Sequence, residues 1–345
     1  MAINMKWTYI RDQLLISGPS MLRYAYYRTV ASIKKNASPK FSIVVPCYNN
    51  PQFLKNTVHS IAAQTLPPTS VVFVNDGSFS NTAEVITHSS SFLKKNNIKT
   101  ITVNQKNKGV AAARNTGINE AEGEWIIPLD YDDTIAPRYI ERCSDIIRTR
   151  PNVQFIYPHS LKTNTKDTYW IPRSGLFHSI LERCLYPAFS AFNKNLWLTV
   201  GGYDVSHPLG MDDWDFFIKI VMSQAQCCRL PFFMGTWRGH DMNETHTARR
   251  NWKCGRAMIV TLSYKWRNRD ETIAALEAIT DMSGEVIKRL QQKVHLFPTH
   301  PYPYMWLALV YKKQKKLDQA IQFARKAKAL DPSNWLMAHV AKMIA

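Results

Sequence analysis

Apolar residues follow two different periods along this chain. Four short apolar runs are rich in β-branched residues, and the intervals between them carry apolar residues at helical spacing, as in 51–64 and 80–96. The strand-like runs are 41–46, 70–76, 98–105 and 124–130. Strands that alternate with helices predict βαβ units, and therefore a mostly parallel sheet covered by helices on both faces.

Polar residues follow each of these predicted strands. They are Tyr48 and Asn49, then Asp76, then Asn104, and finally the stretch 130–133. In open α/β sheets, ligands bind outside the carboxyl ends of the strands. We therefore expect these side chains to converge on one edge of the sheet.

The last of these strand ends carries three carboxylates in four positions, Asp130, Asp132 and Asp133. Like charges repel, and a buried carboxylate is costly unless something offsets its charge. Two interpretations compete. One is a solvated turn with helix-capping aspartates. The other is a divalent cation, because hard cations take clustered oxygen ligands. The stretch alone leaves both open.

The rest of the chain is organised differently. Residues 136–265 are less regular and rich in aromatics, and the sequence becomes helical after about residue 266. Segment 301–334 matches a 34-residue tetratricopeptide pattern. Its packing positions are Leu307, Ala308, Tyr311, Ala320, Ala324, Ala327 and Pro332. One repeat does not make a solenoid, so we expect it to pack on the domain or on a second subunit.

Charge and cysteine content narrow the class of protein. The 345 residues include 44 Lys and Arg against 26 Asp and Glu, which suggests a polyanionic neighbour. Only this charge supports a nucleic-acid partner, since no nucleic-acid-binding motif is present. We therefore expect no nucleic acid as a partner. The arm 1–40 mixes basic and aromatic residues, which suits a membrane headgroup layer or packing on its own domain.

The six cysteines form no C-x-x-C pair, which fits a reducing compartment. No stretch reaches the roughly 20 apolar residues that a membrane span needs. We therefore expect a cytoplasmic protein, with peripheral contact at the inner face of the cell membrane through the basic arm.

Five motifs in order give the chain a specific resemblance. They are "SIVVPCYNN", "VVFVNDGSFSNT", "NKGVAAARNTGINEAEGEWIIPLDYDD", "GGYD" and "DDWDFFIKI". Over roughly 41–250 the chain resembles the family 2 glycosyltransferases, which are inverting enzymes of the GT-A fold that use nucleotide-diphosphate sugars. The resemblance implies an α/β GT-A domain with a nucleotide-sugar-binding half at 41–135 and an acceptor-binding half at 136–265. An all-helical extension follows at 266–345.

The resemblance also implies the donor site. Asp130 and Asp132 correspond to the D-x-D motif, with Asp132 as the metal ligand and Asp130 on ribose or metal. The expected metal is Mn or Mg, with His240 as a possible third ligand. The residues expected on the nucleotide are Pro46, Tyr48, Asn49, Asp76, Arg114 and Asp130. Nucleoside diphosphate is expelled in the reaction, so a cation would neutralise its growing charge.

Three further aspartates begin a predicted helix in the acceptor half. The resemblance makes Asp213 the general base, while plain capping is preferred for Asp212 and a structural role for Asp215. The positive end of the helix dipole would keep such carboxylates ionised. Asp133 has a second interpretation, as N-cap of a helix starting near Ala136.

Other side chains in this half receive weaker assignments. Arg238 is expected to face phosphate, and His246 has less support than His240. Trp170, Phe189 and Trp197 are able to stack on sugars, although core packing is the default for each.

The function implied is inverting transfer of a sugar from a nucleotide-diphosphate donor to a hydroxyl acceptor. Uridine diphosphate is expected by family frequency, and the acceptor is a glycan or lipid-linked glycan in surface glycan or polysaccharide synthesis. A homo-oligomer or protein partner would bind through the C-terminal helices. Two alternatives stay open: an inactive adaptor that uses the helical repeat, and a nucleotidyltransferase. The latter would show a Gly- and Arg/Lys-rich phosphate loop, which "VPCYNNPQF" does not offer.

Overall fold

The structure is a computed structural model that describes residues 38–345, except 80, 164–167, 173–176, 240–250, 268 and 280–283. The expectations for the basic arm up to residue 37, and for His240 and His246, therefore fall outside the described residues.

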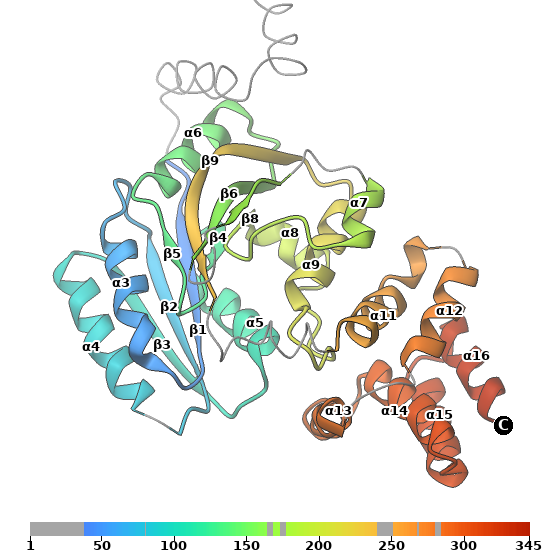
Figure 1. The fold of residues 1–345 in the computed structure, drawn as a ribbon. Coiled ribbons are helices and arrows are strands. Elements are labelled where there is room, and N and C mark those ends of the chain that lie inside the picture. The colour runs from blue at the N-terminus through green and yellow to red at the C-terminus, as the bar shows by residue number, and fades with distance from the viewer. Residues whose placement is uncertain are drawn as a thin grey trace, which may run out of the picture.

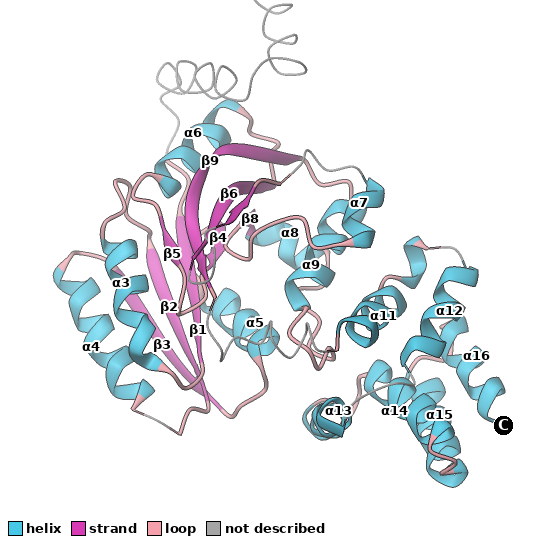
Figure 2. Cartoon of the chain, viewed as in Figure 1, coloured by secondary structure: helices cyan, strands magenta, loops and turns pink. Residues whose placement is uncertain are grey.

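Parallel strands form the first half of the sheet, as the apolar runs predict. These strands are β1 (Phe41–Cys47), β2 (Ser70–Asp76), β3 (Lys99–Gln105) and β4 (Trp125–Pro128). β2 pairs with both β1 and β3, and β4 pairs with the other side of β1. Their carboxyl ends therefore lie at one edge of the sheet (Figures 1 and 2).

The remaining strands extend the sheet beyond β4, and the order across the whole sheet is β3-β2-β1-β4-β8-β6-β9-β5. They are β5 (Thr134–Ile135), β6 (Phe155–Thr163), β7 (Thr168–Trp170), β8 (Ala191–Asn193) and β9 (Cys227–Arg238). β8 is antiparallel to both β4 and β6, and β9 is parallel to β6. β6 and β9 consequently run in the direction of β4 and end at the same edge. β5 pairs antiparallel with β9, and β7 pairs antiparallel with β6.

Helices cover both faces of the parallel strands. The short η1 (Pro51–Phe53), α3 (Leu54–Ala62) and α4 (Thr82–Lys95) lie on one face, and α5 (Val110–Glu120) lies on the other (Figure 1). Alternate residues of β1 enter different cores: Ile43 packs with α3 and α6 residues, and Val44 packs with α5 residues. Burial on both sides explains why β1, β2 and β4 read as apolar runs, whereas the edge strand β3 is partly exposed.

Four further helices lie in the described residues between 136 and 222. They are α6 (Tyr139–Thr149), α7 (Phe177–Glu182), α8 (Lys194–Thr199) and α9 (Asp212–Met222). α6 starts at Tyr139 rather than near Ala136, because residues 134–135 pair with β9 as a strand.

The C-terminal part is helical, as predicted for 266–345, but its helices begin earlier, at Trp252, within the segment that was expected to be less regular. Its helices are α11 (Trp252–Leu262), η2 (Tyr264–Trp266), α12 (Arg269–Ile279), α13 (Gly284–Leu296), α14 (Pro301–Lys313), α15 (Leu317–Leu330) and α16 (Trp335–Ile344). All the predicted tetratricopeptide packing positions are buried except Pro332, which is exposed. These side chains share one continuous core with residues of β1, β2 and α5. The repeat therefore packs on this chain's own domain.

Among the described residues, no helix has both the length and the apolar character that a membrane span requires.

Candidate active site

Arg114 on α5 lies at the centre of the polar edge of the sheet. Its side chain is buried, and the two terminal nitrogens reach different carboxylates: Nη1 is 2.5 Å from Asp212 Oδ2, and Nη2 is 2.6 Å from Asp130 Oδ1. Burial by itself would lower the pKa of the guanidinium, but the two carboxylates raise that pKa well above its usual value. Arg114 therefore stays charged and joins the end of β4 to the start of α9.

Asp212 does not have the role that its sequence position suggests. It is the first residue of α9, the N-cap is Met211, and Met211 makes no capping hydrogen bond. The Asp212 side chain is buried and turns to Arg114. The capping prediction for Asp212 was wrong, because a buried arginine from another element competes for the carboxylate more strongly than a backbone amide.

Asp213, the predicted general base, is the next residue of α9. Its Oδ1 accepts a hydrogen bond from the Trp214 backbone N–H at 2.7 Å, and Cys184 Sγ lies 4.0 Å from Oδ2. Burial and then the charge of Asp212 raise the pKa of Asp213 to about 7. Burial thus outweighs the helix dipole that was expected to keep this carboxylate ionised. A carboxyl group with a pKa near neutrality suits proton transfer at physiological pH.

Asp215, two residues further on, has the structural role that was predicted. It is fully buried, and its Oδ2 lies 2.7 Å from Lys219 Nζ, one turn along the same helix.

The acidic stretch after β4 folds into a turn held from β9. Asp133 donates its backbone N–H to Asp130 O at 3.0 Å, and its buried Oδ1 accepts the Arg238 backbone N–H at 3.0 Å. Arg238 Nε also donates to Asp132 O at 3.1 Å. The N-cap of α6 is Arg138, so the capping prediction for Asp133 was wrong. Its carboxylate fixes the end of β9 instead.

This turn concentrates negative charge. Burial, and then the charges of Asp132 and Asp130, raise the pKa of Asp133 well above its ordinary value. Within the described ranges, no three His, Cys, Asp or Glu side chains are arranged to hold a metal ion. The carboxylates of Asp130 and Asp132 are nonetheless the donor set that Mg²⁺ uses when substrate phosphates complete its coordination. The residues present therefore fit a cation shared with a diphosphate.

Asp76 at the end of β2 organises the loop before α5. Oδ1 accepts from Gln105 Nε2 at 2.7 Å and from the Lys108 backbone N–H at 2.9 Å, and Oδ2 accepts from the Gly109 backbone N–H at 2.8 Å. The next residue, Gly77, has φ +70°, and a Cβ there would lie 2.5 Å from Asn107 N. Asp76 and Gly77 thus hold loop 106–109 against the sheet edge, a role that the sequence alone did not indicate.

The loop after β1 presents an open aromatic surface. Tyr48 is 37% exposed and packs edge-on against Phe79, which is 85% exposed, with ring centroids 5.9 Å apart. Asn49, at φ 51°, accepts the Phe79 backbone N–H at 3.0 Å and donates its own N–H to Ser78 Oγ. Pro46 is buried within β1, opposite Val74. Contacts of these residues with a nucleotide stay predictions.

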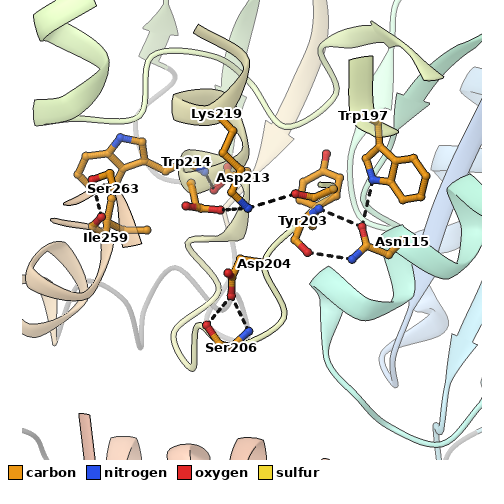
Figure 3. Close-up of polar contacts among 12 residues, drawn as sticks. Asn115, Trp197, Tyr203, Asp204, Ser206, Asp213, Trp214, Lys219, Ile259 and Ser263 are labelled. Carbon is orange, nitrogen blue, oxygen red and sulfur yellow. Dashed lines mark hydrogen bonds and ion pairs between the residues drawn. The ribbon is translucent and has the colours of Figure 1, made fainter. Parts of the chain in front are cut away.

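Asn115, which the sequence did not single out, connects α5 to residues of the second half of the domain (Figure 3). Its Oδ1 accepts from Trp197 Nε1 at 3.1 Å and from the Tyr203 backbone N–H at 3.0 Å, while its Nδ2 donates to Tyr203 O at 2.9 Å. The Tyr203 ring lies 5.4 Å from the Arg114 guanidinium. The only sequence signal was an amide side chain next to Arg114 in a helix otherwise rich in small residues.

The three aromatic residues that were expected to pack in the core or to stack on sugars differ in their burial. Phe189 and Trp197 are buried, in agreement with the packing default, and Trp170 is half-buried.

Comparison with known proteins shows similarity to glycosyltransferases. Residues 42–199 match the family described as Glycosyl transferase family 2. A relative described as an uncharacterized glycosyltransferase from Haemophilus influenzae is 30% identical over 193 residues, covering 53% of this chain and 63% of the relative. Hyaluronan synthase from Pasteurella multocida is 36% identical over 190 residues, covering 54% of this chain and 19% of the synthase. The match thus spans less than two thirds of these relatives.

Solved structures agree on the fold. S. aureus TarS superposes with a TM-score of 0.50 at 15% identity, covering 86% of this chain and 93% of the TarS chain. Its complex with UDP-GlcNAc gives a TM-score of 0.52 at 15% identity, with coverages of 84% and 91%. Segment 42–199 is thus similar to glycosyl transferase family 2, and the predicted GT-A fold with a helical C-terminal part is confirmed.

Proposed function

We propose that this protein is an inverting glycosyltransferase that moves a sugar from a nucleoside-diphosphate donor to a hydroxyl group of a glycan or lipid-linked glycan. The observation that carries the proposal is the Arg114 bridge, which links the strand-end carboxylate Asp130 to Asp212, next to Asp213. A carboxylate pair for the donor and a base for the acceptor thereby meet at one edge of the sheet.

The chain's own residues divide the work of the reaction. Asp213, with its pKa near 7, accepts the proton of the acceptor hydroxyl as that oxygen attacks the anomeric carbon. The bond to the diphosphate breaks on the opposite face, so the configuration inverts. Arg114 holds Asp130 in place, and Tyr48 stacks on the base while Asp76 meets its edge.

Asp130 and Asp132 would hold Mg²⁺ or Mn²⁺ together with the diphosphate. A cation in this position supplies Lewis-acid stabilisation of the charge on the departing phosphate oxygens. Because two carboxylates are neutralised by one divalent ion, the ion would also relieve the repulsion around Asp133.

Uridine diphosphate is the proposed leaving group, and polysaccharide synthesis is the proposed setting. The first is supported by the UDP-GlcNAc complex of TarS, and the second by the printed names of the relatives, which include hyaluronan synthase and chondroitin synthase. The basic balance of +18 fits an anionic glycan or an anionic lipid carrier as the acceptor side.

A thermal-shift panel of nucleoside diphosphates, with and without Mn²⁺ or Mg²⁺, tests the proposal. Ligand binding stabilises in proportion to the logarithm of ligand concentration over its dissociation constant. We expect UDP to shift the midpoint most, with a further increase on adding metal. Asp132→Asn should keep the shift from UDP alone and lose the metal-dependent part. Equal shifts in the two proteins would contradict the metal assignment.

Product analysis tests the reaction itself. Incubation with a UDP-sugar and a hydroxyl acceptor should release UDP and give a product of inverted anomeric configuration by NMR. A product of retained configuration would contradict the mechanism. Consumption of nucleoside triphosphates without UDP-sugar turnover would favour the nucleotidyltransferase alternative, and binding without any turnover would favour the adaptor.

A further inference from the structure

We infer that helix α13 of the C-terminal extension is a brace that positions two loops of the active site through a pair of cationic side chains. Arg289 and Lys293 lie one turn apart on this helix. Arg289 Nη1 is 3.3 Å from Pro208 O, and Lys293 Nζ is 3.3 Å from Lys108 O. One helix in the extension thus contacts a loop from each half of the GT-A domain.

The loop that Lys293 contacts belongs to the donor side. The backbone N–H groups of Lys108 and Gly109 both donate to Asp76, so the carbonyl that Lys293 contacts lies in the same segment that Asp76 binds. Gly109 has φ +92°, and a Cβ built on it would lie 3.1 Å from Lys293 Nζ. The ammonium group therefore lies next to Gly109, the N-cap of α5.

The loop that Arg289 contacts belongs to the acceptor side. Pro208 is four residues before Asp212, so its carbonyl lies in the segment that leads into α9 and Asp213. A cation on this carbonyl fixes the position from which α9 begins.

Helix α13 is itself rigidly held, which a brace requires. Val286 and Leu290 of this helix are fully buried, and they belong to the core that also contains Val44 of β1 and Ala111 of α5. Figure 1 shows α13 beside α14, on the side of the extension that faces α5. The side chains that reach the two loops thus project from a helix anchored in the same core as the sheet.

Two methionine variants test the brace, with a third as control. Lys293→Met removes the contact with the Lys108 carbonyl, and Arg289→Met removes the contact with the Pro208 carbonyl together with the ion pair to Glu285 on the same helix. Lys288→Met removes the same charge from an exposed position of the same helix. Loss of one such hydrogen bond changes an equilibrium by about three- to tenfold. We expect Lys293→Met to raise the KM for the nucleotide sugar by about this factor with kcat nearly unchanged.

Arg289→Met should change kcat rather than the KM for the donor, which is the opposite of the effect expected for Lys293→Met. Its loop leads to Asp213, so kcat should fall by about three- to tenfold while the KM for the donor stays near wild type. Arg289→Lys keeps a donor at the same place and should restore part of kcat. Equal changes in all three variants, or a parallel loss of thermal stability and activity, would overturn the inference.

The expected changes in KM and kcat rest on the proposed function, whereas the expected changes in amide hydrogen exchange do not. Exchange at Lys108 and Gly109 should accelerate in Lys293→Met, exchange at 209–212 should accelerate in Arg289→Met, and Lys288→Met should change neither. If the protein transfers no sugar, this pattern still supports the brace. If both segments exchange as in wild type, the brace is wrong even in an active enzyme.

Discussion

Arg114 and Asp212 are 98 positions apart in the chain, yet the guanidinium and the carboxylate are 2.5 Å apart inside the protein. The contact joins α5, which follows the first three strands, to α9, which carries the proposed base. Since both side chains are buried, neither charge has water as an alternative partner. The two halves of the GT-A domain are therefore coupled electrostatically at the site where donor and acceptor would meet.

Removing the cation of this bridge should be strongly destabilising. Arg114→Met leaves Asp212 buried without its partner, and breaking a buried ion pair on one side costs about 3 to 5 kcal/mol. We expect a loss of about 3 kcal/mol in the free energy of unfolding measured in denaturant, because Asp130 is partly exposed.

A matched variant separates charge from geometry. Arg114→Lys keeps the positive charge, but one ammonium group does not reproduce the planar fork that reaches Asp130 and Asp212 at once. It should recover part of the stability and little of the activity. Full activity in Arg114→Lys would show that the bridging geometry is unimportant.

Replacement of the proposed base should abolish most turnover without loss of donor binding. General-base catalysis contributes about 10²- to 10⁴-fold, so Asp213→Asn should lower kcat by at least about 10²-fold. The amide has nearly the same shape, and the thermal shift with UDP should stay as in wild type. Near-wild-type turnover by a folded Asp213→Asn protein would refute the assignment.

The pH dependence follows from the raised pKa of Asp213. The acid form predominates below about 7, so kcat/KM should rise with pH and level off above about pH 8. The pKa of Asp213 is about 7 in the native state and 3.8 in the unfolded chain, so between these pH values Asp213 is more protonated in the native state. The contribution of Asp213 to the free energy of unfolding therefore falls as the pH rises through that window.

Both quantities are measurable. Initial rates from pH 5.5 to 9 give the profile of kcat/KM, and denaturant unfolding of wild type and Asp213→Asn at several pH values isolates the stability term. A kcat/KM that is constant across this range would contradict a base with a pKa near 7.

Gly77 should be intolerant of a side chain. Its φ of +70° disfavours L residues, and a Cβ would lie 2.5 Å from Asn107 N. Gly77→Ala should displace loop 106–109 from Asp76, raise the KM for the donor and lower stability by about 1 to 3 kcal/mol. Gly201→Ala is the control, because Gly201 has φ +78° with no atom within 4 Å of its Cβ position. Equal costs in the two variants would show that backbone strain, rather than the clash, dominates.

The sequence predicted the strands of the donor half nearly residue by residue, and the reason is local. A strand buried on both faces favours an uninterrupted apolar run, as in 71–74 within the observed β2. The helical C-terminal part and the buried face of its repeat were also readable, because burial at helical spacing leaves a periodic pattern. The convergence of polar residues at one edge followed from the parallel order of the strands.

The sequence did not reveal which partner each polar side chain would choose. Asp212 and Asp133 both have the local pattern of helix caps, yet the first pairs with Arg114 and the second accepts a backbone N–H from Arg238. No local sequence pattern indicated the contact of Lys293 with Lys108, because the two residues are 185 positions apart in the chain. Local propensities are worth about 1 kcal/mol, whereas a buried charge without a partner costs several. Tertiary contacts therefore decide the roles of charged residues, while the backbone pattern already decides the strands that bring them together.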